Sequence, residues 1–239
     1  MADALAPSAG SWREQVLEVH AGPEKVPGMY TRLAPVYEAW ARLAESRARR
    51  RVLEVAALRP GEDVLEVATG TGVQLVRLAL GDRGGRTSGV ELAPGMVKRT
   101  RTRVEQAQLD GRVELIEASA LDLPLEDEGF DLVVNSYMLD LLPRDDIPRA
   151  LSEFKRVLRP DGRLVLSNMT LGERPWHRIW DWAYSRGIVL TANCRGVLAG
   201  PVLREFGFTD IRREYLAQML FPTEIVTARK ESIPTRWRN

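Results

Sequence analysis

Two glycines and an acidic residue form the pattern in this chain of 239 residues that is best suited to chemistry. The segment 64–72, VLEVATGTG, places Gly70 and Gly72 where an apolar strand should turn into a helix. Glycine tolerates unusual backbone angles and lets a ligand approach the main chain, while the free N–H groups that open a helix suit a carboxylate or phosphate. The pattern predicts a ligand site at this turn.

The acidic residue ends the next expected strand, over residues 86–92. Glu91 follows Gly72 by 19 residues, and a carboxylate there can accept hydrogen bonds from both hydroxyls of a ribose. Together the two features predict a nucleoside cofactor. The loop departs from the G-x-G-x-x-G of NAD sites, because Leu75 stands at the third glycine position, and no Lys-Ser/Thr follows for a P-loop. These departures favour S-adenosylmethionine.

Few side chains are candidates for catalysis. His177 lies in a tryptophan-rich segment and could accept a proton, or could be a packing or exposed residue. Tyr137, after the strand expected over residues 130–135, could orient an acceptor or simply be packed. Trp176 and Trp180 share a helical face, which could form an aromatic wall for an apolar acceptor or dock a helix on the core. Cys194 is the only cysteine, so thiolate zinc sites and intramolecular disulfides are excluded, and we predict no metal.

The sequence predicts an α/β fold, which must bring these residues together. Short apolar strands alternate with amphipathic helical stretches, which predicts a mostly parallel sheet covered by helices on both faces, with ligands at the carboxyl ends of the strands. Two consecutive strands near the C-terminus predict an antiparallel pair. Expected strands span 63–68, 86–92, 112–118, 130–135, 163–169, 209–216 and 219–228. Expected helices span 38–58, 73–80, 95–108, 145–158 (ending at a turn over 159–162) and 201–206.

Composition places the chain among soluble globular proteins. Hydrophobic residues make up 44% and charged residues 28%, and the formal net charge of +1 argues against a nucleic-acid partner. No apolar run approaches the roughly 18–20 residues that span a bilayer, and residues 1–10 lack a secretory signal, so we expect a cytoplasmic location. The basic run 47–51 is interpreted as a solvated helix face, with weak contact to anionic lipid or an acidic acceptor as the alternative.

Seven segments occur in an order that is typical of one enzyme family. They are Tyr30-x-x-x-Ala34-Pro35-x-Tyr37, VLEVATGTG at 64–72, GVELAPGM at 89–96, LDLPLEDEGFDLV at 121–133, FKRVLRPDGRLVLSN at 154–168, NCRGVLAGPVLREFGF at 193–208 and FPTEIVTARK at 221–230. Over about residues 29–230 the chain resembles the class I S-adenosylmethionine-dependent methyltransferases. It is most similar to the ubiquinone/menaquinone-biosynthesis C-methyltransferases and the bacterial phospholipid N-methyltransferases.

The resemblance implies a Rossmann-like seven-stranded sheet with one antiparallel strand. It also implies a helical N-terminal lid over residues 1–58, followed by a methyltransferase domain over 59–239 with an acceptor-site insertion at about 171–200. Methyl transfer needs alignment of donor and acceptor more than a base. We expect a small or lipid-like acceptor with an apolar or aromatic body. The alternatives are a phospholipid-headgroup N-methyltransferase and a non-catalytic S-adenosylmethionine-binding regulator, with an NAD-dependent dehydrogenase a distant third; the oligomeric state stays open.

The resemblance also implies which residues bind the cofactor. Around its methionine part these are Glu66, Ala68, Thr69, Gly70 and Gly72; around the ribose and adenine, Glu91, Leu92, Met96, Ser119, Ala120 and Leu121; at the junction with the acceptor, Asn135 and Ser136; and in the lid, Tyr30 and Tyr37. Ser119 stands where many relatives have an acid that bonds the adenine amino group. A serine hydroxyl is shorter and uncharged, so a backbone group or a water is expected to replace this contact.

Overall fold

The computed structural model describes most of the chain beyond residue 44. The described residues are 45–82, 84–174, 176–177, 182, 186, 195–218 and 221–232. Residues 1–44 of the expected lid over 1–58 lie outside this part, as do Tyr30, Tyr37, Trp180 and Cys194. The division into a lid and a domain at residue 59 stays a prediction.

The core element is a seven-stranded sheet in the order β3-β2-β1-β4-β5-β7-β6. Its strands are β1 (Val64–Val67), β2 (Thr87–Glu91), β3 (Val113–Glu117), β4 (Phe130–Ser136), β5 (Leu158–Met169), β6 (Phe208–Gln218) and β7 (Phe221–Lys230). β7 pairs antiparallel with both of its neighbours, and β1 to β5 pair in parallel. The expected sheet with one antiparallel strand is confirmed.

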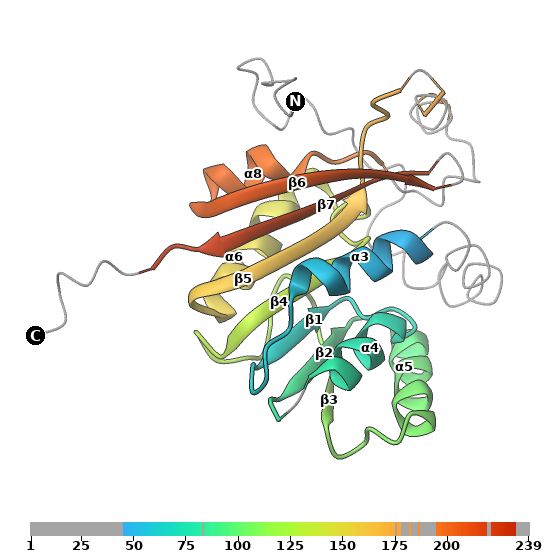
Figure 1. Ribbon diagram of the computed structural model, residues 1–239, viewed down its shortest axis with the longest axis vertical. Coiled ribbons are helices and arrows are strands. Elements are labelled where there is room, and N and C mark those ends of the chain that lie inside the picture. The colour runs from blue at the N-terminus through green and yellow to red at the C-terminus, as the bar shows by residue number, and fades with distance from the viewer. Residues whose placement is uncertain are drawn as a thin grey trace, which may run out of the picture.

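Helices cover both faces of this sheet, as expected. In Figure 1, α3, α4 and α5 lie in front of the strands and α6 and α8 behind them. The helices are α3 (Ser46–Ala56), α4 (Val73–Gly81), α5 (Pro94–Gln106), α6 (Ile147–Val157) and α8 (Ala199–Glu205), with a short 3₁₀ turn η1 (Arg144–Asp146) before α6. None of the described helices is long and apolar enough to cross a bilayer.

The central strands are apolar on both faces because both are covered by helices. Successive side chains of a strand point to opposite faces. Leu65 and Val133 therefore join the cluster that contains Phe154 of α6, whereas Val64 and Leu132 join the cluster that contains Leu78 of α4. The two clusters fix the carboxyl ends of β1 and β4 side by side.

One expected boundary is wrong: the turn predicted over residues 159–162 belongs to β5. The pairing register with β4 shifts at this point, and Asp161 takes a left-handed φ of 63°. The Arg159 guanidinium contacts Asp131 and lies 2.7 Å from Asp63. The strand can begin directly after α6 because this irregularity absorbs the Pro-Asp-Gly sequence.

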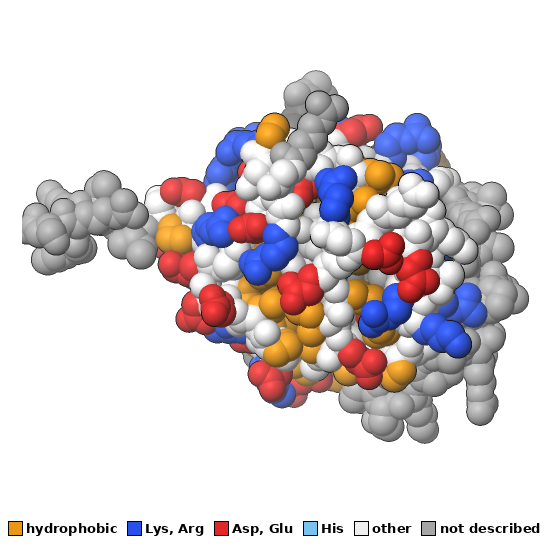
Figure 2. Space-filling view, turned by 90° about the horizontal axis from the view of Figure 1, so that it is seen from below, with side chains coloured by type: hydrophobic (Ala, Val, Ile, Leu, Met, Phe, Trp, Pro, Cys, Tyr) orange, Lys and Arg blue, Asp and Glu red, His pale blue; other side chains and the backbone are white. Residues whose placement is uncertain are grey.

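The surface at the β3 end of the sheet mixes charges of both signs. Figure 2 looks at this end of the molecule and shows Lys and Arg side chains interspersed with Asp and Glu around a strip of apolar side chains. This distribution agrees with the near-balanced count of 34 basic and 33 acidic residues.

Candidate functional site

A cavity of about 230 Å³ lies at the carboxyl ends of β1 to β4. The strand order reverses between β1 and β4, and this switch point is where open α/β sheets bind ligands. The cavity collects most of the residues expected from the sequence. These are Glu66, Ala68, Thr69, Gly70, Glu91, Leu92, Met96, Ser119, Ala120, Leu121, Ser136 and Tyr137.

The glycine turn between β1 and α4 uses left-handed backbone at three positions, Ala68 (φ 59°), Gly70 (φ 56°) and Gly72 (φ 76°). A Cβ atom at Gly70 would meet nothing within 4 Å, so the space beside this residue is open. A Cβ atom at Gly72 would lie 2.8 Å from Cγ2 of Thr100 on α5. Gly72 is absent from the cavity lining, so we assign it to close packing of the turn against α5 and not to ligand contact.

Glu91 and the glycine turn are joined by a direct hydrogen bond. The Gly70 N–H donates to Oε2 of Glu91 at 2.8 Å, and the Ala93 N–H donates to Oε1 at 2.9 Å. Burial raises the pKa of Glu91, and these backbone donors act against that rise. The two N–H donors fix the carboxylate in place. Each of its oxygens can accept a second hydrogen bond, so the group can still bind the hydroxyls of a ligand.

Glu66 is the most unusual acid of the cavity. It is buried, and its Oε2 atom has no hydrogen-bond partner among the described residues. Burial raises the pKa of Glu66 well above its usual range; the Arg49 guanidinium lowers it, and the Glu91 carboxylate raises it further. An unpartnered buried acid facing a cavity is suited to a ligand that brings a cationic group.

Arg49 of α3 lines the cavity, and the sequence pattern did not identify it. Its guanidinium contacts Glu45 at 2.6 and 3.1 Å, and its side chain is only 16% exposed. The interpretation of the run 47–51 as a solvated face is correct for Arg47 and Arg50, which are exposed, and wrong for Arg49. The apolar spacing of Ala48, Val52 and Ala56, which marks the buried face of α3, was the available signal.

The side chain of Tyr137 reaches from the cavity wall into the core. Its hydroxyl lies 3.0 Å from Oγ1 of Thr223 on β7, and its ring packs against Phe221 at 5.8 Å. Burial raises the pKa of Tyr137 well above its usual range, so the phenol stays protonated. Tyr137 can shape the cavity, but its hydroxyl is already engaged.

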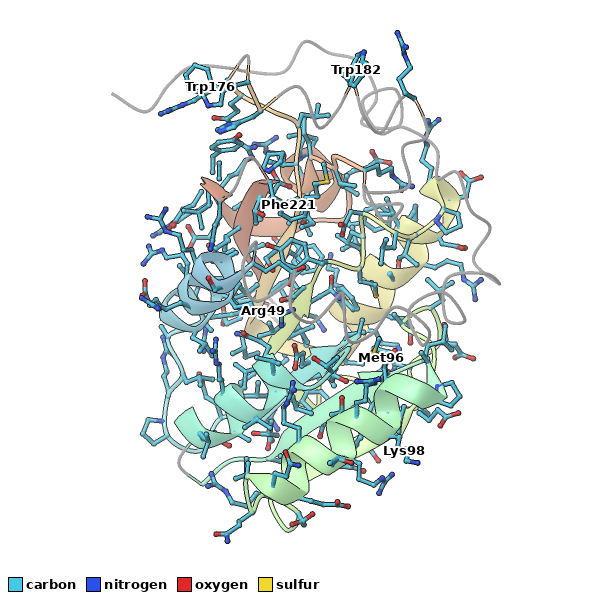
Figure 3. The ribbon with its side chains drawn as sticks, turned by 90° about the vertical axis from the view of Figure 1, so that its right-hand side faces the viewer. Arg49, Met96, Lys98, Trp176, Trp182 and Phe221 are labelled. Carbon is cyan, nitrogen blue, oxygen red and sulfur yellow. The ribbon has the colours of Figure 1, made fainter. Side chains whose placement is uncertain are left out.

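Besides Gly72, two other expected site residues do not line the cavity. Asn135 is buried and donates from Nδ2 to the Val67 carbonyl at 2.9 Å, so it joins β4 to β1. His177 is buried with Nδ1 at 2.6 Å from the Tyr215 hydroxyl, and Trp176 packs edge-on against its ring. Figure 3 shows Trp176 and Trp182 at one end of the molecule, away from Arg49 and Met96 in its middle.

Comparisons with known proteins find methyltransferases among the relatives of this chain. Residues 64–162 match the family profile described as "Methyltransferase domain". The 2-phytyl-1,4-naphtoquinone methyltransferase of Nostoc sp. is 28% identical over 172 residues, which cover 70% of this chain and 74% of the relative. The demethylmenaquinone methyltransferase of Thermus thermophilus is 35% identical over 142 residues, which cover 58% and 63%.

Solved structures show the same fold. The [4+2]-cyclase SpnF has a TM-score of 0.71 at 20% identity, over 90% of this chain and 99% of that structure. An S-adenosylmethionine-dependent methyltransferase from Thermotoga maritima, described as a possible histamine N-methyltransferase, has a TM-score of 0.66 at 22% identity, over 86% and 100%. At these identities the likeness establishes architecture alone, and one of these two neighbours is described as a cyclase.

The fold, the glycine turn and the matching family define a class I methyltransferase that uses S-adenosylmethionine. Several of its sequence relatives are described as methyltransferases of phytyl-naphthoquinone, demethylmenaquinone or ubiquinone/menaquinone biosynthesis. The expected class and cofactor are confirmed.

Proposed function

We propose that this enzyme methylates a quinone-type acceptor, a small or lipid-like molecule with an aromatic body. The observation that carries the proposal is the apolar wall after β4, where Met138, Leu141 and Leu142 line the cavity with Tyr137. Apolar pockets with few polar groups suit such ring systems. Curated relatives described as naphthoquinone and demethylmenaquinone methyltransferases support the same acceptor class.

The charges along the cavity suggest how S-adenosylmethionine is oriented. Glu66 lines the cavity together with Glu91 and Arg49, and the charges of both affect its pKa. We assign the ribose hydroxyls to Glu91, the α-ammonium group to the unpartnered Oε2 of Glu66, and the α-carboxylate to Arg49. Arg49 lines the cavity together with Tyr137 and the apolar wall, so in this orientation the methionine end of the cofactor lies toward that wall.

The side chains of the cavity act mainly by orientation. S-adenosylmethionine supplies a methyl group that is already activated on a sulfonium, so alignment and exclusion of water are the main tasks of the protein. Orientation of this kind contributes at most about 7–11 kcal/mol. The protonated Tyr137 phenol and the apolar residues beside it serve this purpose, whereas His177 is not placed at the cavity to remove a proton.

Turnover on a panel of acceptors tests the proposal. We expect the purified enzyme to transfer methyl groups to a short-chain prenyl naphthoquinol and not to the oxidised quinone, because only the reduced ring is nucleophilic. Product would be identified by mass spectrometry. Methylation of phosphatidylethanolamine instead would contradict the quinone proposal and support the phospholipid alternative. Cofactor binding without turnover on any acceptor would support the non-catalytic regulator.

The Glu66 assignment predicts that cofactor affinity depends on pH. The raised pKa keeps Glu66 protonated in the free enzyme over a wider pH range, and a ligand ammonium favours the ionised form, so binding should release a proton. We expect S-adenosylhomocysteine to bind more tightly at about pH 8 than at about pH 6. In Glu66→Gln the affinity should depend less on pH. The remaining pH dependence should come from Glu91, since its pKa is raised too.

Calorimetry in two buffers of different ionisation enthalpy measures the released proton directly. The control is Glu62→Gln, a buried acid that pairs with Arg163 at 2.6 Å and does not line the cavity. Equal proton release by the wild type and Glu66→Gln would remove Glu66 from the ammonium site.

A further inference from the structure

In many relatives an acid after β3 binds the adenine amino group. This chain has Ser119 at that position, so it lacks the usual acid. Its Oγ accepts a hydrogen bond from the Leu121 N–H at 3.1 Å, so the side chain stabilises the turn after β3. Ser119, Ala120 and Leu121 line one side of the cavity, together with Leu92 and Met96. In the proposed orientation Glu91 binds the ribose, and the resemblance to the methyltransferases implies that these residues surround the adenine.

Asp146, from the connection between β4 and α6, lines the same cavity. It stands at the N-cap position of α6 but does not cap the helix, because its backbone is already helical (φ −87°, ψ −21°) and its side chain makes no capping bond. The half-buried carboxylate has no hydrogen bond or ion pair in the described part of the chain. No contact within the described part of the chain explains why an acidic side chain lies at the cavity here.

We assign Asp146 to the adenine side of the cavity because α6 packs against the segment after β3. Ile147, the next residue, belongs to the same apolar cluster as Ala120, Leu121 and Leu142. The segment after β3 also contacts α6 directly, since the Leu123 N–H donates to Oε2 of Glu153 at 2.8 Å. Asp146, at the start of α6, lines the same cavity as Ala120 and Leu121. Its neighbour Asp145 is exposed and does not line the cavity.

We propose that Asp146 accepts the hydrogen bond from the 6-amino group of adenine and so replaces the acid missing at position 119. The inference rests on the cofactor orientation given above. A carboxylate can only accept hydrogen bonds, so it favours the amino group of adenine and disfavours the carbonyl oxygen at the same position of hypoxanthine. Asp146 thereby makes the site specific for an adenine nucleoside.

The test compares S-adenosylhomocysteine with its deaminated counterpart, S-inosylhomocysteine, by calorimetry. The wild type should bind the adenosyl compound about tenfold or more tightly, the scale of a hydrogen bond to a charged group. Asp146→Asn should narrow or reverse this preference, because an amide can donate to the hypoxanthine oxygen. Asp146→Ala should lose the preference without reversing it. Asp145→Asn, which removes the same charge from the neighbouring residue, should show the same ligand preference as the wild type.

A wild-type preference retained in both Asp146 variants would overturn the inference, and so would an equal loss of both ligands. Thermal unfolding of each variant shows whether the fold is kept. The measurement needs no methyl acceptor. Failure here would therefore leave the quinone proposal standing, and failure of turnover on quinols would leave Asp146 in place.

Discussion

Replacing Glu91 by alanine is expected to weaken S-adenosylmethionine binding by about 1.5–3 kcal/mol, or roughly 10- to 150-fold, the scale of hydrogen bonds to a charged group. The carboxylate is held by the N–H groups of Gly70 and Ala93, so its oxygens are oriented before a ribose arrives. Alanine removes the acceptor and also releases the N–H of the glycine turn. Titration calorimetry with the cofactor and with S-adenosylhomocysteine measures the loss.

The matched control is Glu117→Ala. Glu117 pairs with Glu91 in the register between β2 and β3, carries the same charge at a strand end, and is exposed outside the cavity lining. Its removal should leave the affinity unchanged, whereas Glu91→Gln should give an intermediate loss because one oxygen acceptor remains. If Glu91→Ala and Glu117→Ala lost equal affinity for the cofactor, the change in net charge would explain the effect. If Glu91→Ala lost no affinity, Glu91 would be excluded from the ribose site.

The strand–turn–helix unit and its partner acid could be predicted because their signals are local. The glycines at 70 and 72 are required by backbone angles of that one turn, and Glu91 ends the next strand along the chain. Parallel pairing of β1 and β2 then brings the two features together across 21 residues, as the Gly70–Glu91 hydrogen bond shows. A rule about adjacent parallel strands was enough to predict that the two features belong to one site, although not that they are hydrogen-bonded to each other.

Other parts of the site depend on packing between distant segments, which local patterns do not report. Arg49 reaches the cavity because α3 packs against β5 and β7, more than a hundred residues further along the chain. The Tyr137 hydroxyl is engaged because Thr223 of the antiparallel strand lies beside it, and His177 is paired with Tyr215 of β6. For Tyr137 and His177 the residue type suggested chemistry, but a partner from the C-terminal strands already engages the side chain.

Gly70→Val is expected to reduce cofactor binding at least about 100-fold, or about 2.7 kcal/mol. The open space beside Gly70 is the cavity side of the turn, so the two methyl groups of valine would occupy volume that the ligand needs. A second effect must be separated from this one. Gly70 has a φ of 56°, and a β-branched residue there costs roughly 1–3 kcal/mol of strain, so stability should fall as well.

Gly61→Val separates the two effects, because Gly61 has the same combination of features away from the ligand. Its φ is 82°, a Cβ atom there would meet nothing within 4 Å, and it does not line the cavity. Both variants should lose stability in thermal unfolding, but only Gly70→Val should lose binding in calorimetry. If Gly61→Val lost binding to the same degree, destabilisation alone would explain the result. If Gly70→Val still bound the cofactor, the ligand could not lie against the glycine turn, and the orientation assigned to it would be wrong.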